Sequence, residues 1–168
     1  MKLQELSNPT DIHSDFILVD NTGAVRKYKN KNDGKLLICR MGTDYDYMFS
    51  YDDYTYKQNL GASTALSVFK TVLYDIKTYV IDKKERCIYF TADSYETSRI
   101  KLYNALSKMM SKFGYTRIET YKDIKLYFED PDTIYEKLDD TDYIHYLFVK
   151  KNSNIIPLEE VRNPSKTI

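Results

Sequence analysis

Several features that mark special classes of protein are scarce in this sequence. Its 168 residues include only 5 Gly and 4 Pro, which excludes collagen-like and low-complexity arrays. No uncharged apolar run reaches the roughly 18 residues that a membrane-spanning helix needs. The N-terminal segment MKLQELSNPTDIHSDF also lacks the apolar centre of a signal peptide. We therefore expect a soluble, cytoplasmic protein with no membrane partner.

An excess of charge of one sign is also missing. Lys and Arg number 25 and Asp and Glu number 25, so the net field of the chain is too weak to hold a polyanion. Basic and aromatic residues do alternate over residues 26–29, a pattern that can bind nucleic acid by phosphate contact and stacking. The neutral total charge disfavours nucleic acid as a partner.

Cysteine and histidine are rare. Cys39 and Cys87 each lie inside an apolar run, which favours buried free thiols over a disulfide. The 2 histidines, His13 and His145, have no Cys or acidic residue near them at metal-ligand spacing, so no metal site is predicted. His145 alternates within a strand-like segment, which favours a cross-strand packing partner over a catalytic residue.

The residues that are present suffice to build a core. Apolar residues make up 42% of the chain, and the aromatic ones include 17 Tyr and 7 Phe. The length suits one domain, and we predict a single domain over residues 1–151 with a polar C-terminal tail over residues 152–168. Lys far outnumbers Arg, alongside many Asn, Ile, Tyr and Phe. This usage follows from A/T-rich codons and indicates a bacterial, plasmid or phage genome.

Short β-prone runs separated by turn-forming residues open the chain. They cover residues 16–19, 25–29 and 35–41, which predicts an antiparallel meander. Over residues 44–56 aromatic and acidic residues alternate, which predicts one further strand with a polar face.

Two amphipathic helices are predicted in the middle of the chain. The first spaces its apolar residues three and four apart, at Ala65, Val68, Phe69, Val72, Leu73, Ile76 and Val80. The second begins within residues 94–98 and ends at Gly114. A nearly all-apolar strand over residues 87–92 separates them, as expected where both faces of a sheet are covered. Together with the strand expected over residues 44–56, the order strand, helix, strand, helix predicts a crossover between parallel neighbouring strands. Further strands are expected at residues 115–121 and 143–151.

The start of the first helix is a candidate binding site. Gln58 and Gly61 stand in a turn of small residues that continues into Ser63 and Thr64. Backbone N–H groups at a helix start point outward with the positive end of the helix dipole, which together form an anion site. In the alternative interpretation, Gly61 only lets the chain turn, and Ser63 or Thr64 caps the helix.

The order of elements, with Q-x-x-G-x-S before one helix and Phe113-Gly114-Tyr115 closing the next, resembles the GNAT superfamily of N-acetyltransferases over residues 16–121 and 143–151. The resemblance implies an α/β (α+β) fold with a central mixed, mostly antiparallel sheet flanked by helices. It also implies acetyl-CoA as co-substrate and no metal, with the pyrophosphate held by Gln58, Leu60, Gly61, Ala62, Ser63 and Thr64. In detail the spacing looks most like small uncharacterised GNAT-like proteins encoded by phages.

The catalytic residues match the family less closely. The family's general-acid Tyr lies four residues before the helix-ending glycine, where this sequence has Met110. The resemblance leaves Tyr103, two turns earlier on the same helical face, as the candidate acid and Asp53 as the candidate base. Arg99 is a candidate ligand for a phosphate or a substrate carboxylate. Plainer interpretations are a packing role for Tyr103, a surface acid at Asp53 and a solvated Arg99.

Two functions are predicted. The first is transfer of acetyl from acetyl-CoA to an amine of an unknown acceptor, for which the acidic, Tyr-rich residues 44–56 suit a cation such as a lysine or a polyamine. The alternative is a catalytically inactive GNAT-like phage protein in the host cytoplasm. Such a protein would bind a protein partner in host interaction or anti-defence, or form part of the virion.

Overall fold

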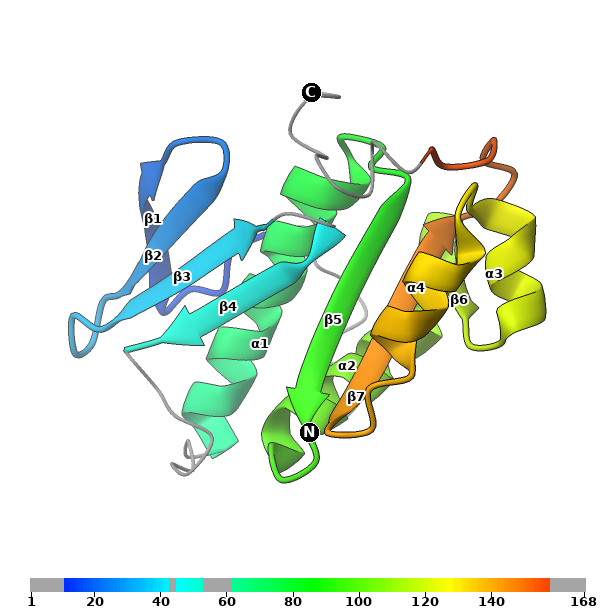
Figure 1. Cartoon of the computed structure of the whole chain (residues 1–168). Helices are drawn as coiled ribbons and strands as arrows, with labels where there is room; N and C mark the ends of the chain where they lie inside the picture. Colours follow the sequence, from blue (N-terminus) through cyan, green and yellow to red (C-terminus); the bar gives the residue numbers. More distant parts are fainter. Residues whose placement is uncertain (1–10, 43–44, 53–61, 158–168) are drawn as a thin grey trace. The chain divides into compact units, whose positions relative to one another are not determined.

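The computed structural model describes residues 11–42, 45–52 and 62–157, and these divide into two compact units (Figure 1). The first unit holds residues 11–41, 47–52 and 62–84, and the second holds residues 42, 45, 46 and 85–157. Each unit combines an antiparallel sheet with helices, so the predicted α/β (α+β) class is confirmed. Among the described residues, no helix is both long enough and apolar enough to cross a membrane.

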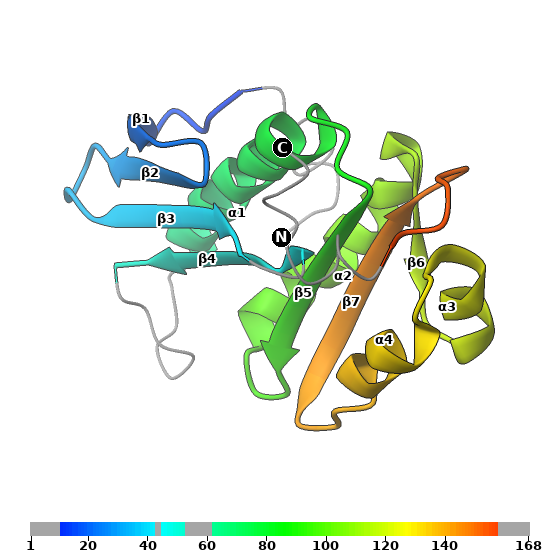
Figure 2. The same cartoon turned by 45° about the horizontal axis from the view of Figure 1, so that its top comes forward.

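The first unit is built on the predicted meander. Its strands are β1 (Phe16–Asn21), β2 (Val25–Asn30), β3 (Leu36–Met41) and β4 (Tyr47–Tyr51), and each pairs antiparallel with the next (Figure 2). Gly23 and Gly34 lie in the two turns with φ of 87° and 77°, left-handed values that favour glycine because it has no Cβ. The predicted turns are therefore confirmed.

The acidic strand is shorter than the sequence pattern predicts. β4 ends at Tyr51, and Asp52 leaves it with φ of 49°. That left-handed backbone cannot continue a pleated ladder, so the alternation of aromatic and acidic residues does not carry the strand onward at Asp52. Residues 43–44 and 53–56 of the predicted strand lie outside the described residues.

A long helix packs on one face of this sheet. It is α1 (Ala62–Ile76), which continues as one π-helical segment, η3 (Lys77–Ile81). Every apolar position predicted for the helix, from Ala65 to Val80, is buried. The predicted amphipathic face is therefore confirmed, and Asp75 is buried with it.

A fully buried charged group, the Asp75 cluster, lies at the centre of the first unit. The Asp75 carboxylate accepts hydrogen bonds from Arg26 Nε at 2.9 Å and from Arg26 Nη2 at 2.5 Å. It also accepts from the hydroxyls of Tyr28 at 2.6 Å and Tyr47 at 2.8 Å. Each carboxylate oxygen thus accepts two hydrogen bonds, which is the condition under which a buried ion pair is tolerated.

Burial and charge fix the protonation states in the Asp75 cluster. Burial opposes the charge of Arg26, but the hydrogen bond and Coulomb attraction to Asp75 outweigh it, and the pKa of Arg26 is raised. Burial is the largest cause that raises the pKa of Tyr28 and of Tyr47, and the Asp75 charge adds to it. Both tyrosines therefore remain hydrogen-bond donors.

Because of these contacts, two residues of the basic and aromatic pattern at residues 26–29 are not accessible to a ligand. Arg26 is 1% exposed and Tyr28 is 0% exposed, because alternate residues of β2 face the helix-covered side of the sheet. Neither side chain can contact a phosphate or stack on a base in this fold. The pattern over residues 26–29 therefore does not support binding of nucleic acid by Arg26 and Tyr28.

The second unit has a sheet of three strands. They are β5 (Cys87–Asp93), β6 (Tyr115–Ile118) and β7 (Tyr143–Lys150), in the spatial order β5-β7-β6 with both ladders antiparallel. β5 and β6 run parallel to each other, with the long apolar β7 between them. Within the described residues, parallel pairing is confined to two isolated bridges, Asp46 with Tyr89 and Phe128 with Ile156.

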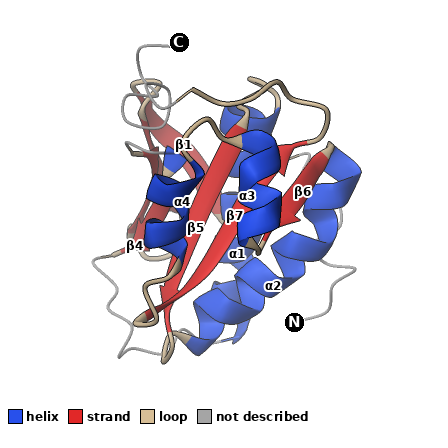
Figure 3. Cartoon of the chain, turned by 45° about the vertical axis from the view of Figure 1, so that its right-hand side comes forward, coloured by secondary structure: helices blue, strands red, loops and turns tan. Residues whose placement is uncertain are grey.

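Helices cover both faces of the three-stranded sheet. α2 (Thr97–Met110) lies on one face, and α4 (Pro131–Leu138), packed against α3 (Tyr121–Tyr127), lies on the other (Figure 3). The first four residues of β5 are buried whichever face they point to, as predicted for this strand. α2 ends through η4 (Ser111–Phe113) at Gly114, whose φ of 88° stops the helix where the sequence predicts.

The beginning of the predicted C-terminal tail is docked. Ile156 is 0% exposed, its N–H donates to the Tyr127 carbonyl at 2.8 Å, and its carbonyl accepts from the Glu129 N–H at 3.0 Å. The polar composition of residues 152–168 gives no sign of this apolar contact at Ile156, and the folded part of the chain extends past residue 151.

Candidate functional site

An open hollow of about 330 Å³ lies in the second unit, bordered by β5, β7 and α4. The side chains around it are mostly acidic or aromatic, and they include Asp46, Tyr89, Glu136, Asp140, Tyr143 and His145. Small-molecule sites combine aromatic side chains with a few polar groups that converge on one concave surface. This hollow is therefore the candidate functional site.

A tyrosine and a histidine form a hydrogen-bonded pair in the hollow. The Tyr89 hydroxyl bonds to Nδ1 of His145, and Nε2 of the same ring bonds to the backbone carbonyl of Asp140. A carbonyl can only accept, so Nε2 carries a hydrogen, and in the neutral ring Nδ1 accepts from Tyr89. A proton that reaches the Tyr89 oxygen can therefore be relayed to His145.

The surroundings of the pair support this assignment of protons. Burial, followed by the charges of Asp46 and Asp140, raises the pKa of Tyr89, so its hydroxyl keeps its proton and donates. The rings of Tyr89 and His145 are stacked, with centroids 5.9 Å apart. The predicted role of His145 as a cross-strand partner is thus confirmed, and the contact also gives it a hydrogen-bonding role.

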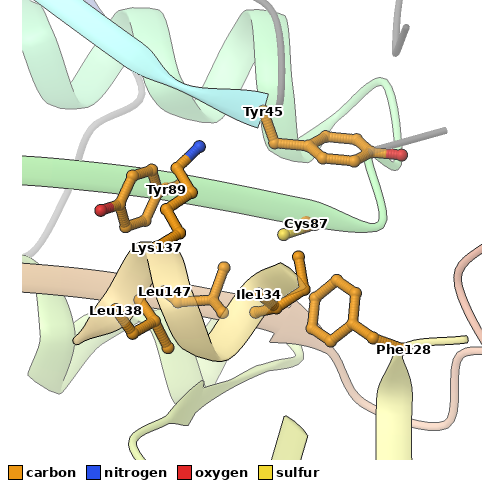
Figure 4. A pocket seen from close by; sticks show the side chains of 8 residues that line it. All are labelled: Tyr45, Cys87, Tyr89, Phe128, Ile134, Lys137, Leu138 and Leu147. Atoms are coloured by element: carbon orange, nitrogen blue, oxygen red, sulfur yellow. The ribbon is translucent and has the colours of Figure 1, made fainter. Parts of the chain in front are cut away.

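An ammonium group of the chain itself already lies against Tyr89. The Lys137 Nζ is 4.3 Å from the centroid of the Tyr89 ring and 2.9 Å from Oδ1 of Asp46. Figure 4 shows the Lys137 side chain reaching across the Tyr89 ring. A carboxylate beside an aromatic face is a favourable environment for an ammonium ion.

The hollow carries more negative than positive charge. Among the described residues that line it, Asp46, Glu136 and Asp140 supply three carboxylates and Lys137 supplies one ammonium. Glu136 forms no ion pair with another described residue. The α4 helix places Glu136 and Lys137 here because Ile134, which is 6% exposed, is anchored on the sheet.

A small apolar pocket adjoins the hollow and shares Tyr89 and Lys137 with it (Figure 4). Cys87, Ile134 and Leu147 line it. Burial raises the pKa of the Cys87 thiol, so this sulfur is a neutral packing group and not a nucleophile. Cys39 and Cys87 are both free and buried, as predicted.

The residues predicted to bind the cofactor are only partly described. Gln58, Leu60 and Gly61, and the candidate base Asp53, lie outside the described residues. Ala62, Ser63 and Thr64 form the first turn of α1, so the helix begins where the anion site requires. The assignment of a pyrophosphate to this turn stays a prediction.

The remaining predicted site residues lie on or beside α2, away from the hollow. Tyr103 is 1% exposed and packs between Phe90 and Tyr146, with centroid distances of 4.9 Å and 5.4 Å. Arg99 pairs with Glu96 at 2.7 Å. The packing interpretation of Tyr103 fits this geometry, and neither Tyr103 nor Arg99 lines the hollow.

Sequence reasoning did not single out Tyr89 or Lys137. A signal for Tyr89 was present, because a hydroxyl inside a strand covered on both faces needs a hydrogen-bond partner, and His145 stands in another predicted strand. No comparable signal marks Lys137, since its contact depends on how α4 packs on the sheet.

Comparison of the chain with protein-family models, with curated proteins and with solved structures found no match. The inference of function therefore depends on the chemistry of the hollow and on the pattern of the sequence.

Proposed function

We propose that this chain is a GNAT-like acetyltransferase that transfers acetyl from acetyl-CoA to an amine. The observation that carries the proposal is the Tyr89–His145 pair inside an acidic hollow. An acceptor amine is a cation at neutral pH and must lose a proton before it attacks a thioester. Carboxylates attract the cation, and the pair offers a path for its proton.

The order of elements gives further support. A meander, a helix that opens after Gly61, a buried strand and a helix closed by Gly114 follow one another as the resemblance implies. The cofactor is assigned by the same resemblance to Gln58 and to residues 60–64.

The proposed reaction moves two protons. The bound ammonium gives one proton to the Tyr89 oxygen while Tyr89 passes its own to Nδ1 of His145, and Nε2 keeps its bond to the Asp140 carbonyl. The free amine nitrogen then bonds to the acetyl carbon, and the carbon–sulfur bond breaks. The second proton goes from that nitrogen to the departing thiolate. No phenolate accumulates, which agrees with the raised pKa of Tyr89.

Isothermal titration of the full chain with acetyl-CoA, CoA and ATP tests the cofactor. We expect micromolar binding of acetyl-CoA and none of ATP. Gly61→Glu should abolish binding, because it places bulk and a negative charge where the pyrophosphate is assigned. Asn32→Glu adds the same charge in an exposed turn and should bind normally. Unchanged affinity in Gly61→Glu would remove this loop from the site, and no binding by the unaltered chain would overturn the proposal.

A second candidate function is a catalytically inactive, phage-encoded module that binds a protein partner. The observation that favours it is on α2, where Met110 stands at the family's acid position and is 0% exposed. Tyr103 is buried as well. This candidate predicts a folded chain that does not bind acetyl-CoA, so the same titration separates the two functions.

A further inference from the structure

We propose that the hollow of the second unit binds an aliphatic diamine or polyamine, whose ammonium group displaces that of Lys137 from the face of Tyr89. The position of the Lys137 ammonium shows that the hollow accommodates an alkylammonium group. It lies 4.3 Å from the Tyr89 ring centroid and 2.9 Å from Asp46 Oδ1. An incoming alkylammonium group would use the same two contacts. Binding is independent of whether acetyl transfer follows.

The Lys137 contact is one that a ligand can replace. Its side chain is 30% exposed and that of Asp46 is 37% exposed, and ion pairs exposed to this degree contribute little free energy. Lysine also has a flexible stem, which can turn the ammonium into solvent without moving the backbone of α4. Displacement therefore costs little and opens the face of Tyr89.

The charge of the hollow favours a ligand with more than one ammonium group. Once Lys137 has turned away, Asp46, Glu136 and Asp140 present three carboxylates. These come from three separate segments of the unit, the connection before β4, the α4 helix and the loop after it. A linear polyamine can place successive charges near successive carboxylates, whereas a single small cation meets them one at a time.

The aromatic side chains favour an organic cation over a hydrated metal ion. Tyr143 is 44% exposed and its ring lies edge-on to His145, with centroids 6.5 Å apart, and His145 in turn stacks on Tyr89. Alkylammonium ions bind to such ring faces and their methylene groups pack on them. Magnesium prefers a shell of oxygen ligands and water.

Titration calorimetry of the full chain with spermidine and putrescine tests the proposal. We expect spermidine to bind more tightly than putrescine, and 1,4-butanediol, which has the length of putrescine but no charge, not to bind. Magnesium chloride at matched ionic strength should leave the spermidine affinity unchanged. Absence of spermidine binding, or its full displacement by magnesium, would overturn the proposal.

Three variants locate the binding site. Glu136→Gln should weaken spermidine binding by about fivefold, and Lys137→Met should strengthen it by about fivefold because the competing ammonium is gone. Asp123→Asn removes a half-buried carboxylate of the same unit that does not line the hollow, and should have no effect. Equal weakening in Glu136→Gln and Asp123→Asn would indicate diffuse attraction and contradict a defined site. Acetyl-CoA titrations of the same variants report separately on the proposed enzyme.

Discussion

The two units of this protein use the same kinds of side chain in opposite ways. In the first unit, Asp75 is bonded to Arg26 with both side chains at 2% exposure or less. In the second, Asp46 is paired with Lys137 at 37% and 30% exposure. Each acid has a base and a tyrosine beside it, so residue type alone does not distinguish them.

The Asp75 cluster and the hollow differ in how many of their hydrogen bonds and ion pairs are already formed within the protein. Both carboxylate oxygens of Asp75 are fully used by groups of its own unit, so the cluster has nothing to offer a ligand. The hollow, by contrast, is open, and the described residues that line it carry more carboxylates than ammonium groups. A closed polar cluster serves the fold, whereas an open cluster whose charge is incompletely neutralised can bind a ligand.

Removing the buried acid should have the largest effect. Asp75→Asn leaves the Arg26 guanidinium buried without its counter-charge, which typically costs about 3–5 kcal/mol of unfolding free energy. Asp46→Asn, the matched change in the open pair, should cost about 1 kcal/mol or less. Urea denaturation followed by circular dichroism measures both. Equal losses would mean that burial does not separate the two acids as described.

Breaking the hydrogen bond between Tyr89 and His145 should have the next largest effect, on catalysis. Tyr89→Phe removes the proton relay but keeps the ring, and should lower kcat for amine acetylation by about 100-fold. His145→Asn should cost about the same, and the double variant should lose no more, because the two residues act in one path.

The control for this experiment is Tyr135→Phe, which removes the hydroxyl of an exposed tyrosine of the same unit that does not line the hollow. Its kcat should stay near that of the unaltered protein. The relay would be refuted by normal turnover in Tyr89→Phe, measured from the CoA released.

The sequence predicts the elements of this protein better than their neighbours in the sheets. The spacing from Ala65 to Val80 and the glycines at turns act locally, and all are found as predicted. The position of β7 between β5 and β6 is not local, because it depends on a strand that arrives from far along the chain. The place of β7 in the sheet therefore could not be predicted from the order of the elements.

The residues that the sequence singles out for binding show the same division between local and distant information. The helix start at Ala62 follows from adjacent residues and is found. The alternation over residues 26–29 includes Arg26 in a basic pattern, but the side chain of Arg26 pairs with Asp75 on α1. An acid at position 75 on an otherwise apolar helix face should have indicated a buried partner, since an unpaired charge is not tolerated there. The partner itself could not be read from spacing.

The smallest expected effect is a change in the pH dependence of stability. The pKa of Tyr28 is raised in the folded protein, through burial and Asp75, so the folded state holds this proton more tightly than the unfolded state does. The resulting stability is fully present below the ordinary tyrosine pKa of about 10 and is lost as pH rises beyond it. Between pH 8 and pH 11 the unaltered protein should therefore lose about 1.4 kcal/mol more than Tyr28→Phe does. Urea denaturation of both proteins at the two pH values measures this difference. Identical losses would show that the Tyr28 phenol is not held by the closed cluster of the first unit.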